Sequence, residues 1–326
     1  MTSLRERSSF LLRTIFLPIL IPLLFNSSIF NIEKKEAVSL YDKYYAGTKI
    51  NSIPWNGSVN ACDPGKLSTE ILTMAENRIN YFRSATGLQP VTLSEEFNKK
   101  AQLTALMMTA NNQISHTPAK NWKCYTDSGS DGAKNSNLGI SDFENFPDLS
   151  FITGFILDYG SINNNIGHRK WLLNSKAEKM GYGATGKHEA IYVTGLNTSA
   201  SPETPEFIAY PPAGYFPHNL VFEKWSFALP AGSEVDFRKA RVEMTDGNGK
   251  KMNVRILSTE DPWYFDPTLV WQAEDLFSKD EIKYVRNSLA ERGYLDKPIT
   301  VQITNVQVNS KKKDFEYKVI PFDPIK

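Results

Sequence analysis

Two of the four histidines lie in sequence contexts that could build a chemical site. His116 follows a predicted helix in the run Ser115-His116-Thr117-Pro118, and His168 opens a short predicted helix after Gly167. Imidazole works as a general base or as a metal ligand near neutral pH. The two histidines are far apart along the chain, so they form one site only if the fold brings them together.

The other two histidines, His188 and His218, stand beside predicted turns, and we expect surface or packing roles for both. His188 ends a glycine-rich run, Gly181–His188, that contains G-x-G-x-x-G and nearly matches a phosphate-binding loop. Both motifs need a helix after the loop. Here the next residues, Ala190–Thr194, read as a strand, and His188 replaces the Ser or Thr that would bind magnesium. We therefore interpret the run as a strand and a hairpin turn.

Cys62 and Cys124 are the only cysteines of the chain. In an exported protein, two cysteines most simply form one disulfide. Closing a loop of about 60 residues would stabilise the fold by roughly 4 kcal/mol in the chain-entropy model. A cysteine nucleophile and two free buried thiols are the alternatives, although neither cysteine lies in a catalytic signature.

The N-terminal residues 1–30 have the pattern of a secretory signal peptide. Arg5, Arg7 and Arg13 precede the apolar run Ile15–Phe25, which two prolines interrupt. A transmembrane helix needs about 20 apolar residues, so this run is short for one. The sequence predicts a secreted, periplasmic or cell-surface protein with no stable membrane span once the signal is removed; an uncleaved membrane anchor is the alternative.

Composition indicates a globular protein of two domains. The 326 residues are 41% hydrophobic and 22% charged, with a formal net charge of +1. This balance excludes disorder and collagen-like or coiled-coil repeats. A net charge this close to zero also indicates no overall basic surface that would bind nucleic acid.

The first half of the chain predicts a layered α/β domain. A lead-in over residues 31–60 has no clear period, and residues 119–147, rich in Gly, Ser, Asn and Asp, predict a long irregular loop. Asp63-Pro64 predicts the start of the first helix. The expected helices cover Leu67–Phe82 with a stop at Gly87, Ser94–Asn112, Leu149–Leu157 and Gly167–Asn174, and the expected strands cover Met180–Gly183 and Ala190–Gly195.

The second half predicts a β-sandwich over residues 218–326. Five prolines between Ser201 and Pro217 indicate a stiff linker over residues 205–217. Alternating apolar and polar residues predict strands at Lys224–Leu229, Ala240–Thr245, Met252–Leu257, Thr268–Gln272, Ile299–Val308 and Phe315–Pro321. Asp246–Gly249 predicts a hairpin turn, and a capping box at Ser278 predicts one helix that ends at Gly293.

Several short motifs, taken in order, resemble the CAP domain (cysteine-rich secretory protein, antigen 5 and pathogenesis-related 1) in its bacterial, SCP-like extracellular form. They are Asn77-Arg78, Gly87–Leu93, Ala101-Gln102, Ser115-His116, Gly167–Asn174 and Met180–Gly183. The resemblance covers roughly residues 65–200, and we assign residues 61–204 to this domain. It implies a three-layer α-β-α sandwich with a central cleft.

The resemblance also implies that His116 and His168 face each other in the cleft and hold a divalent metal such as zinc. The family has a Gly-Glu-Asn motif between the histidines, whereas this chain has Ser136-Asn137-Leu138. A hydroxyl at position 136 cannot replace the carboxylate as a strong ligand. Asp158 is a candidate for a compensating carboxylate, and Arg169 for pairing with a carboxylate or binding an anion.

We expect an exported binding protein whose cleft takes a small ligand, a lipid or a divalent metal in extracellular or host interaction. A peptidase-like hydrolase is the alternative, with His116 as base, Ser115 or Ser136 as nucleophile and Asp158 orienting a histidine, or with a metal-bound water. A third alternative is an adhesin acting through residues 218–326. Tryptophans are expected to pack structurally rather than form a carbohydrate platform: Trp171 with Leu172 and Leu173 in the core, and Trp55, Trp122, Trp225, Trp263 and Trp271 at scattered sites.

Overall fold

A computed structural model describes residues 31–50, 52–140, 150–158, 160, 163–197, 201, 203–232, 234–260, 265–276 and 288–325. The predicted leader, Trp263 and most of the predicted 278–293 helix lie outside these residues. The last turn of that helix is present as α7 (Ser288–Glu291), and Gly293 follows it with φ +74°. None of the described helices is both long and apolar enough to span a bilayer.

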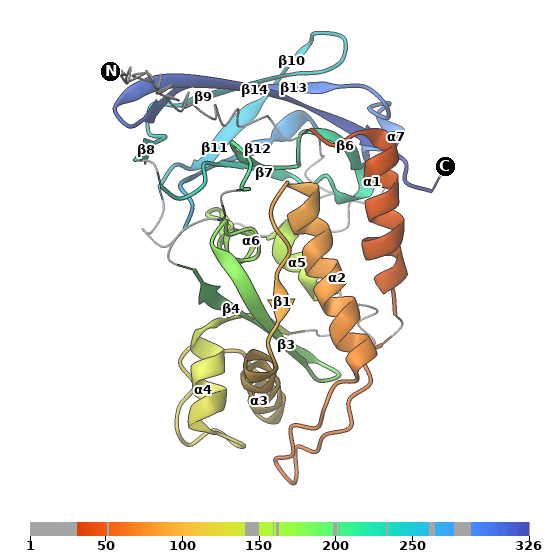
Figure 1. Ribbon diagram of the computed structural model, residues 1–326, viewed down its shortest axis with the longest axis vertical. Coiled ribbons are helices and arrows are strands. Elements are labelled where there is room, and N and C mark those ends of the chain that lie inside the picture. Colours follow the sequence, from red (N-terminus) through yellow and green to blue (C-terminus); the bar gives the residue numbers. More distant parts are fainter. Residues whose placement is uncertain are drawn as a thin grey trace, which may run out of the picture.

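The first half of the chain is a three-layer α-β-α sandwich, as predicted (Figure 1). Its sheet has the order β1-β3-β4-β2, with only β1 and β3 parallel. Helices α2 and α5 cover one face, and α3 and α4 cover the other. The bounds are α2 Thr69–Ala85, β1 Thr92–Leu93, α3 Glu95–Asn111, α4 Asp127–Lys134, β2 Ser136–Ile140, α5 Ser150–Leu157, α6 Gly167–Leu172, β3 Ala177–Ala184 and β4 His188–Leu196.

The two faces of β4 follow from the alternation of side chains along a strand. Ile191 and Val193 belong to the cluster beneath α2 and α5, whereas Ala190 and Tyr192 pack with α3 and α4. A strand with apolar residues at consecutive positions is thereby buried on both sides.

The first predicted helix start is wrong. Helix α2 begins at Thr69, and the hydroxyl of Ser68 accepts a hydrogen bond from the backbone N–H of Ile71 at 3.3 Å. Asp63 instead closes a turn, in which its carboxylate accepts from the N–H of Gly65 at 3.0 Å. The predicted stop is confirmed, because Gly87 has φ +79°, a backbone conformation that favours glycine.

The predicted long loop over 119–147 is also wrong, since it contains α4 and β2. Helix α4 is built from small residues because it lies against α3. A Cβ at Gly132 would come within 2.6 Å of the carbonyl oxygen of Lys100. Glycine, which indicated a loop in the sequence, is therefore required at this position by the close packing of α4 against α3.

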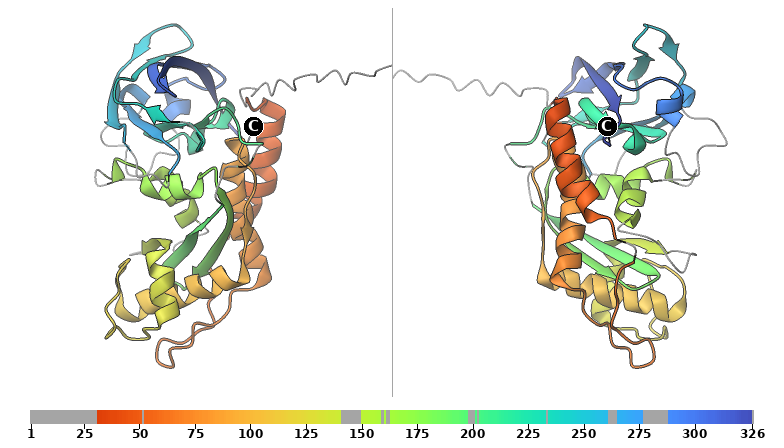
Figure 2. Two further views of the ribbon diagram at one scale, coloured as in Figure 1. Left: turned by 60° about the vertical axis from the view of Figure 1, so that its left-hand side comes forward. Right: turned by 90° about the vertical axis from the view of Figure 1, so that its right-hand side faces the viewer.

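Residues 34–48 of the lead-in are helical, although the sequence shows no helical period there. Helix α1 (Lys34–Leu40) continues into the helical turns Tyr41–Tyr45 and Ala46–Thr48 and runs beside α2 (Figure 2). Tyr41 and Tyr45 enter the main core, while Ile32 and Ala37 pack on Phe322 near the C-terminus. The lead-in thus connects the two halves of the molecule.

The second half is a β-sandwich, as predicted, stacked on one end of the α/β half (Figure 1). One sheet has the order β10-β9-β13-β14-β6 with β8 beside β13, and the other has the order β11-β12-β7-β5. The rings of Phe227 and Phe315 meet between them at 4.9 Å. The bounds are β5 Ile208–Tyr210, β6 Gly214–Pro217, β7 Lys224–Ala228, β8 Val235–Asp236, β9 Arg241–Thr245, β10 Lys251–Met252, β11 Val254–Ser258, β12 Thr268–Ala273, β13 Ile299–Val308 and β14 Lys311–Phe322.

The predicted linker over 205–217 contributes strands to this sandwich. Strand β5 pairs antiparallel with β7, and β6 pairs parallel with β14. The predicted hairpin at Asp246–Gly249 joins β9 to β10, and the Asp246 carboxylate accepts from the N–H groups of Asn248 and Lys250. Trp225 and Trp271 are fully buried between the sheets, as structural packing predicts.

Candidate functional site

His116 and His168 line one cavity of about 260 Å³ in the α/β half. The loop after α3 carries His116, and the first turn of α6 carries His168. Two further predicted residues, Ser136 and Asn137 of β2, line the same cavity. The remaining lining residues are Lys134, Asn135, Asn163, Asn165, Gly167, Trp171, Val193 and Thr194.

Asp158 fixes the orientation of His168. Its Oδ1 lies 2.8 Å from Nδ1 of His168, and its Oδ2 accepts from the backbone N–H groups of His168 and Arg169 at 3.0 and 3.3 Å. The carboxylate accepts, so Nδ1 carries a proton, and in the neutral ring Nε2 keeps the lone pair. Asp158 itself is buried and does not line the cavity.

His116 has the same tautomer for a different reason. Its Nδ1 lies 2.9 Å from the carbonyl oxygen of Ala133, near the end of α4. A carbonyl oxygen can only accept, so Nδ1 donates and Nε2 is again the basic nitrogen. The cavity is therefore lined by two imidazoles whose Nε2 atoms can each accept a hydrogen bond or a proton.

The predicted serines differ in position. Ser136 is buried, and its hydroxyl has no hydrogen-bond partner among the described residues. Ser115 does not line the cavity; its hydroxyl accepts from the N–H of Thr117 at 3.1 Å. Asn137 donates from its amide nitrogen to the carbonyl oxygen of His168 at 3.1 Å and so ties β2 to α6.

Arg169 points away from the cavity, contrary to the predicted role in anion binding. Its guanidinium is buried and donates to the carbonyl oxygens of Ile156 and Lys224 at 2.6 and 2.8 Å and to the Ser226 hydroxyl at 3.2 Å. Burial lowers the pKa of Arg169 to about 10. The residue next to His168 therefore connects α5 to strand β7 of the sandwich.

Sequence reasoning missed most of the polar lining. Asn163 and Asn165 belong to an asparagine run that precedes His168, and that run is the one signal in the sequence that could have indicated them. Trp171 was predicted in the core but is only half-buried. It lines the cavity and packs edge-on against Phe265 with the ring centroids 4.8 Å apart.

The donor set does not fit a resident zinc ion. Zinc sites in proteins use three or four Cys, His, Asp or Glu ligands. Across the described ranges, no group of three such side chains is placed to hold a metal. Ser136 offers a neutral hydroxyl where the resemblance implies a carboxylate, and both oxygens of Asp158 already accept hydrogen bonds around His168.

The two remaining histidines lie elsewhere. His188, at the start of β4, is buried, and its Nδ1 lies 3.0 Å from the hydroxyl of Thr109 in α3. Burial lowers the pKa of His188 to about 4, so the ring is neutral. His218 is also buried. The glycine-rich run is the end of β3 and the turn to the antiparallel strand β4, as predicted.

The sequence model of the cysteine-rich secretory protein family, CAP, matches residues 76–196. The chain contains a CAP domain. The matched residues run from within α2 to the end of β4 and include both cavity histidines. The β-sandwich lies outside the match.

One solved structure similar to the chain is that of an extracellular protein containing an SCP domain from Bacillus anthracis str. Ames. The two share 18% sequence identity over 39% of this chain, with a TM-score of 0.28. The match spans 43% of that chain, less than half of its length. No curated protein matches this chain significantly.

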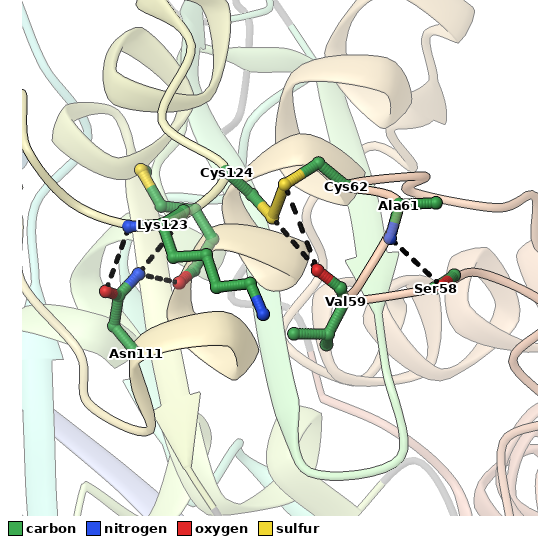
Figure 3. Close-up of a disulfide and its surroundings, with 8 residues drawn as sticks. Ser58, Val59, Ala61, Cys62, Asn111, Lys123 and Cys124 are labelled. Atoms are coloured by element: carbon green, nitrogen blue, oxygen red, sulfur yellow. Dashed lines mark hydrogen bonds between the residues drawn. A yellow bond between two sulfur atoms is a disulfide. The ribbon is translucent and has the colours of Figure 1, made fainter.

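The predicted disulfide is confirmed. Cys62 and Cys124 are bonded with an S–S distance of 2.06 Å (Figure 3). The bond joins the loop before α2 to the loop that follows His116. Beside it, the side chain of Asn111 exchanges two hydrogen bonds with the backbone of Lys123, at 3.0 and 3.1 Å. Cys62 precedes the residues matched by the CAP family, so the disulfide attaches the preceding loop to the CAP domain.

Proposed function

We propose that the CAP domain binds a small polar ligand in the cavity between His116 and His168. The observation that carries this proposal is the lining itself, in which asparagine, lysine, serine and threonine side chains surround two imidazoles. A lipid tail needs a mainly apolar pocket, and ligand pockets usually have volumes of about 300–1,000 Å³. At about 260 Å³, this cavity is smaller than that range and favours a compact ligand over a lipid.

The hydrogen-bonding groups define the ligand further. The two Nε2 atoms accept hydrogen bonds, so they match hydroxyl or amine donors of a ligand. Asn163, Asn165 and Lys134 supply donors for its oxygen atoms. Trp171 supplies a ring surface for an apolar face. Small hydroxylated ring compounds, such as monosaccharides, combine all three features.

An extracellular setting supports this role. The signal-like N-terminus and the disulfide are both typical of exported proteins. The match to the cysteine-rich secretory protein family agrees with the same setting. The ligand is therefore expected outside the cell, at its surface or in the host environment.

Saturation-transfer NMR with a panel of monosaccharides, amino acids and short fatty acids tests the proposal. At least one polar compound should bind saturably, and a His116→Ala/His168→Ala variant should lose that binding. Lys120→Ala, an exposed change outside the cavity, is the matched control. Saturable binding of a fatty acid alone, or equal binding by the double variant, would contradict the proposal.

A hydrolase is a second candidate, and the Asp158–His168 pair favours it. A carboxylate that orients a histidine is the usual support for a general base. No hydrogen bond joins Ser136 to His168 in the described part of the chain, so the base would activate a water molecule. Turnover of chromogenic ester or peptide substrates that is lost in Asp158→Ala, but kept in Asp42→Ala, would support this candidate. No turnover in the wild-type protein would exclude these substrates.

A further inference from the structure

Helix α5 ends beside the cavity, and its last carbonyl groups have no partners within the helix. Asp158 follows with φ +52°, and Gly160 with φ +95°, so the backbone turns sharply away. Arg169 donates to the carbonyl oxygens of Ile156 and Leu157 at 2.6 and 3.3 Å. Within the turn, the backbone N–H groups of Asn163 and Ile166 donate to the carbonyl oxygens of Gly160 and Asn163 at 3.1 and 3.0 Å, which leaves the Asp158 carbonyl oxygen without a backbone donor among the described residues.

The donor to this carbonyl oxygen comes from the sandwich. Lys224 is the first residue of β7, and its Nζ donates to the carbonyl oxygens of Asp158, Gly160 and Asn163, at 2.7, 2.7 and 3.2 Å. An ammonium group has three N–H donors, and all three are used here. Lys224 is only 3% exposed, so these bonds replace its hydration.

The bonded carbonyls belong to the segment that shapes the cavity. Asp158 orients His168 through its carboxylate while its own carbonyl is held by Lys224. Asn163 lines the cavity, and its carbonyl is held by the same amine. One lysine of the sandwich thus fixes the backbone at Asp158, which orients His168, and at Asn163, which lines the cavity.

The two imidazoles differ in their dependence on this contact. His116 is held by the carbonyl of Ala133 in α4, which has no bond to Lys224. His168 depends on Asp158 and therefore on the turn that Lys224 closes. A change at Lys224 should disturb one ring and leave the other in place.

We infer that Lys224 is a positioning residue through which the β-sandwich sets the geometry of the CAP cavity. This inference rests on the proposed function for its biological meaning, because it assigns the sandwich a part in ligand binding. The inference itself states that Lys224 holds the His168 ring in place through Asp158. This effect can be measured without a ligand.

The test is NMR of the full chain labelled with ¹⁵N-histidine, comparing wild type, Lys224→Met and Lys318→Met. Lys318 is exposed on β14 of the same sandwich and serves as the matched control. We expect wild type and control to show a single His168 tautomer, with the proton on Nδ1. Lys224→Met should lose this single-tautomer signature at His168 and keep it at His116.

A folded Lys224→Met protein with an unchanged His168 spectrum would overturn the inference. Equal disturbance of His116 and His168 would do the same, because it would indicate general loosening. If the methionine variant does not fold, Lys224→Gln keeps two N–H donors on a shorter stem and is judged by the same criteria. Failure of both variants to fold would leave Lys224 a purely structural residue. Because no ligand is added, these outcomes are independent of whether the polar panel binds.

Discussion

Asp158 and His168 form a hydrogen bond that spans the boundary between the core and the cavity. Oδ1 of Asp158 lies 2.8 Å from Nδ1 of His168, and the Asp158 side chain is completely enclosed while that of His168 is 31% exposed. A carboxylate removed from water, with its hydrogen bonds satisfied, holds the ring in one orientation and one tautomer. The exposed end of the imidazole is then available to the cavity.

Replacing Asp158 should destabilise the fold as well as free His168. In Asp158→Ala, the backbone N–H groups of His168 and Arg169 lose their acceptor, and the nearby buried cations lose a countercharge. Removing one partner of such a buried charged network costs about 3 kcal/mol. Urea unfolding should show this loss, whereas Asp42→Ala, an exposed change, should stay near wild type. A loss equal to that of the control would contradict the structural role given to Asp158.

Introducing a carboxylate at position 136 should strengthen zinc binding in the cavity. Ser136 lines the cavity together with His116 and His168, so Ser136→Glu adds a third ligand of the kind that zinc prefers. One additional ligand worth about 1.4 kcal/mol would tighten zinc binding roughly tenfold. Calorimetric titration of zinc into both proteins measures this gain, and Ser136→Gln controls for side-chain size. Equal zinc affinity in all three proteins would show that position 136 is not a ligand position.

A buried glutamate should make stability fall with rising pH. Glu189 of β4 is buried, and burial raises its pKa to about 8, against the opposing effect of Arg78. The folded state then holds a proton that the unfolded state releases near pH 4.5, so its stabilising effect is lost as pH rises towards 8. Glu189→Gln should remove this slope and be more stable than wild type at pH 9.

Unfolding of this variant by urea at pH 5, 7 and 9 provides the measurement. The matched control is Glu178→Gln, at an exposed position on β3. Its stability should follow the wild-type pH dependence. Parallel curves for wild type and Glu189→Gln would mean that Glu189 is ionised in the folded protein at neutral pH.

The sequence was sufficient for the layered fold and for the choice of His116 and His168, because periodicity and short motifs are local signals. It was insufficient for α4, where Gly132 is required by contact with α3 rather than by helix propensity. Lys224 could not be identified, since its partners are backbone carbonyls that only the tertiary fold brings near β7. Arg169 was misassigned for the same reason, because a charged residue beside His168 reads as part of a cleft.

The disulfide should contribute strongly to stability without shaping the cavity. Cys62 and Cys124 are separated by 62 residues, and closing such a loop stabilises the folded state by about 4 kcal/mol in the chain-entropy model. Cys62→Ala/Cys124→Ala should lose an amount of this order in urea unfolding, and wild type with the disulfide reduced should behave like the variant. The Nδ1 tautomer of His116 should persist in both, because Ala133 holds the ring independently of the disulfide. If His116 loses that tautomer on reduction, the loop between His116 and Cys124 depends on the disulfide, and the bond belongs to the support of the cavity.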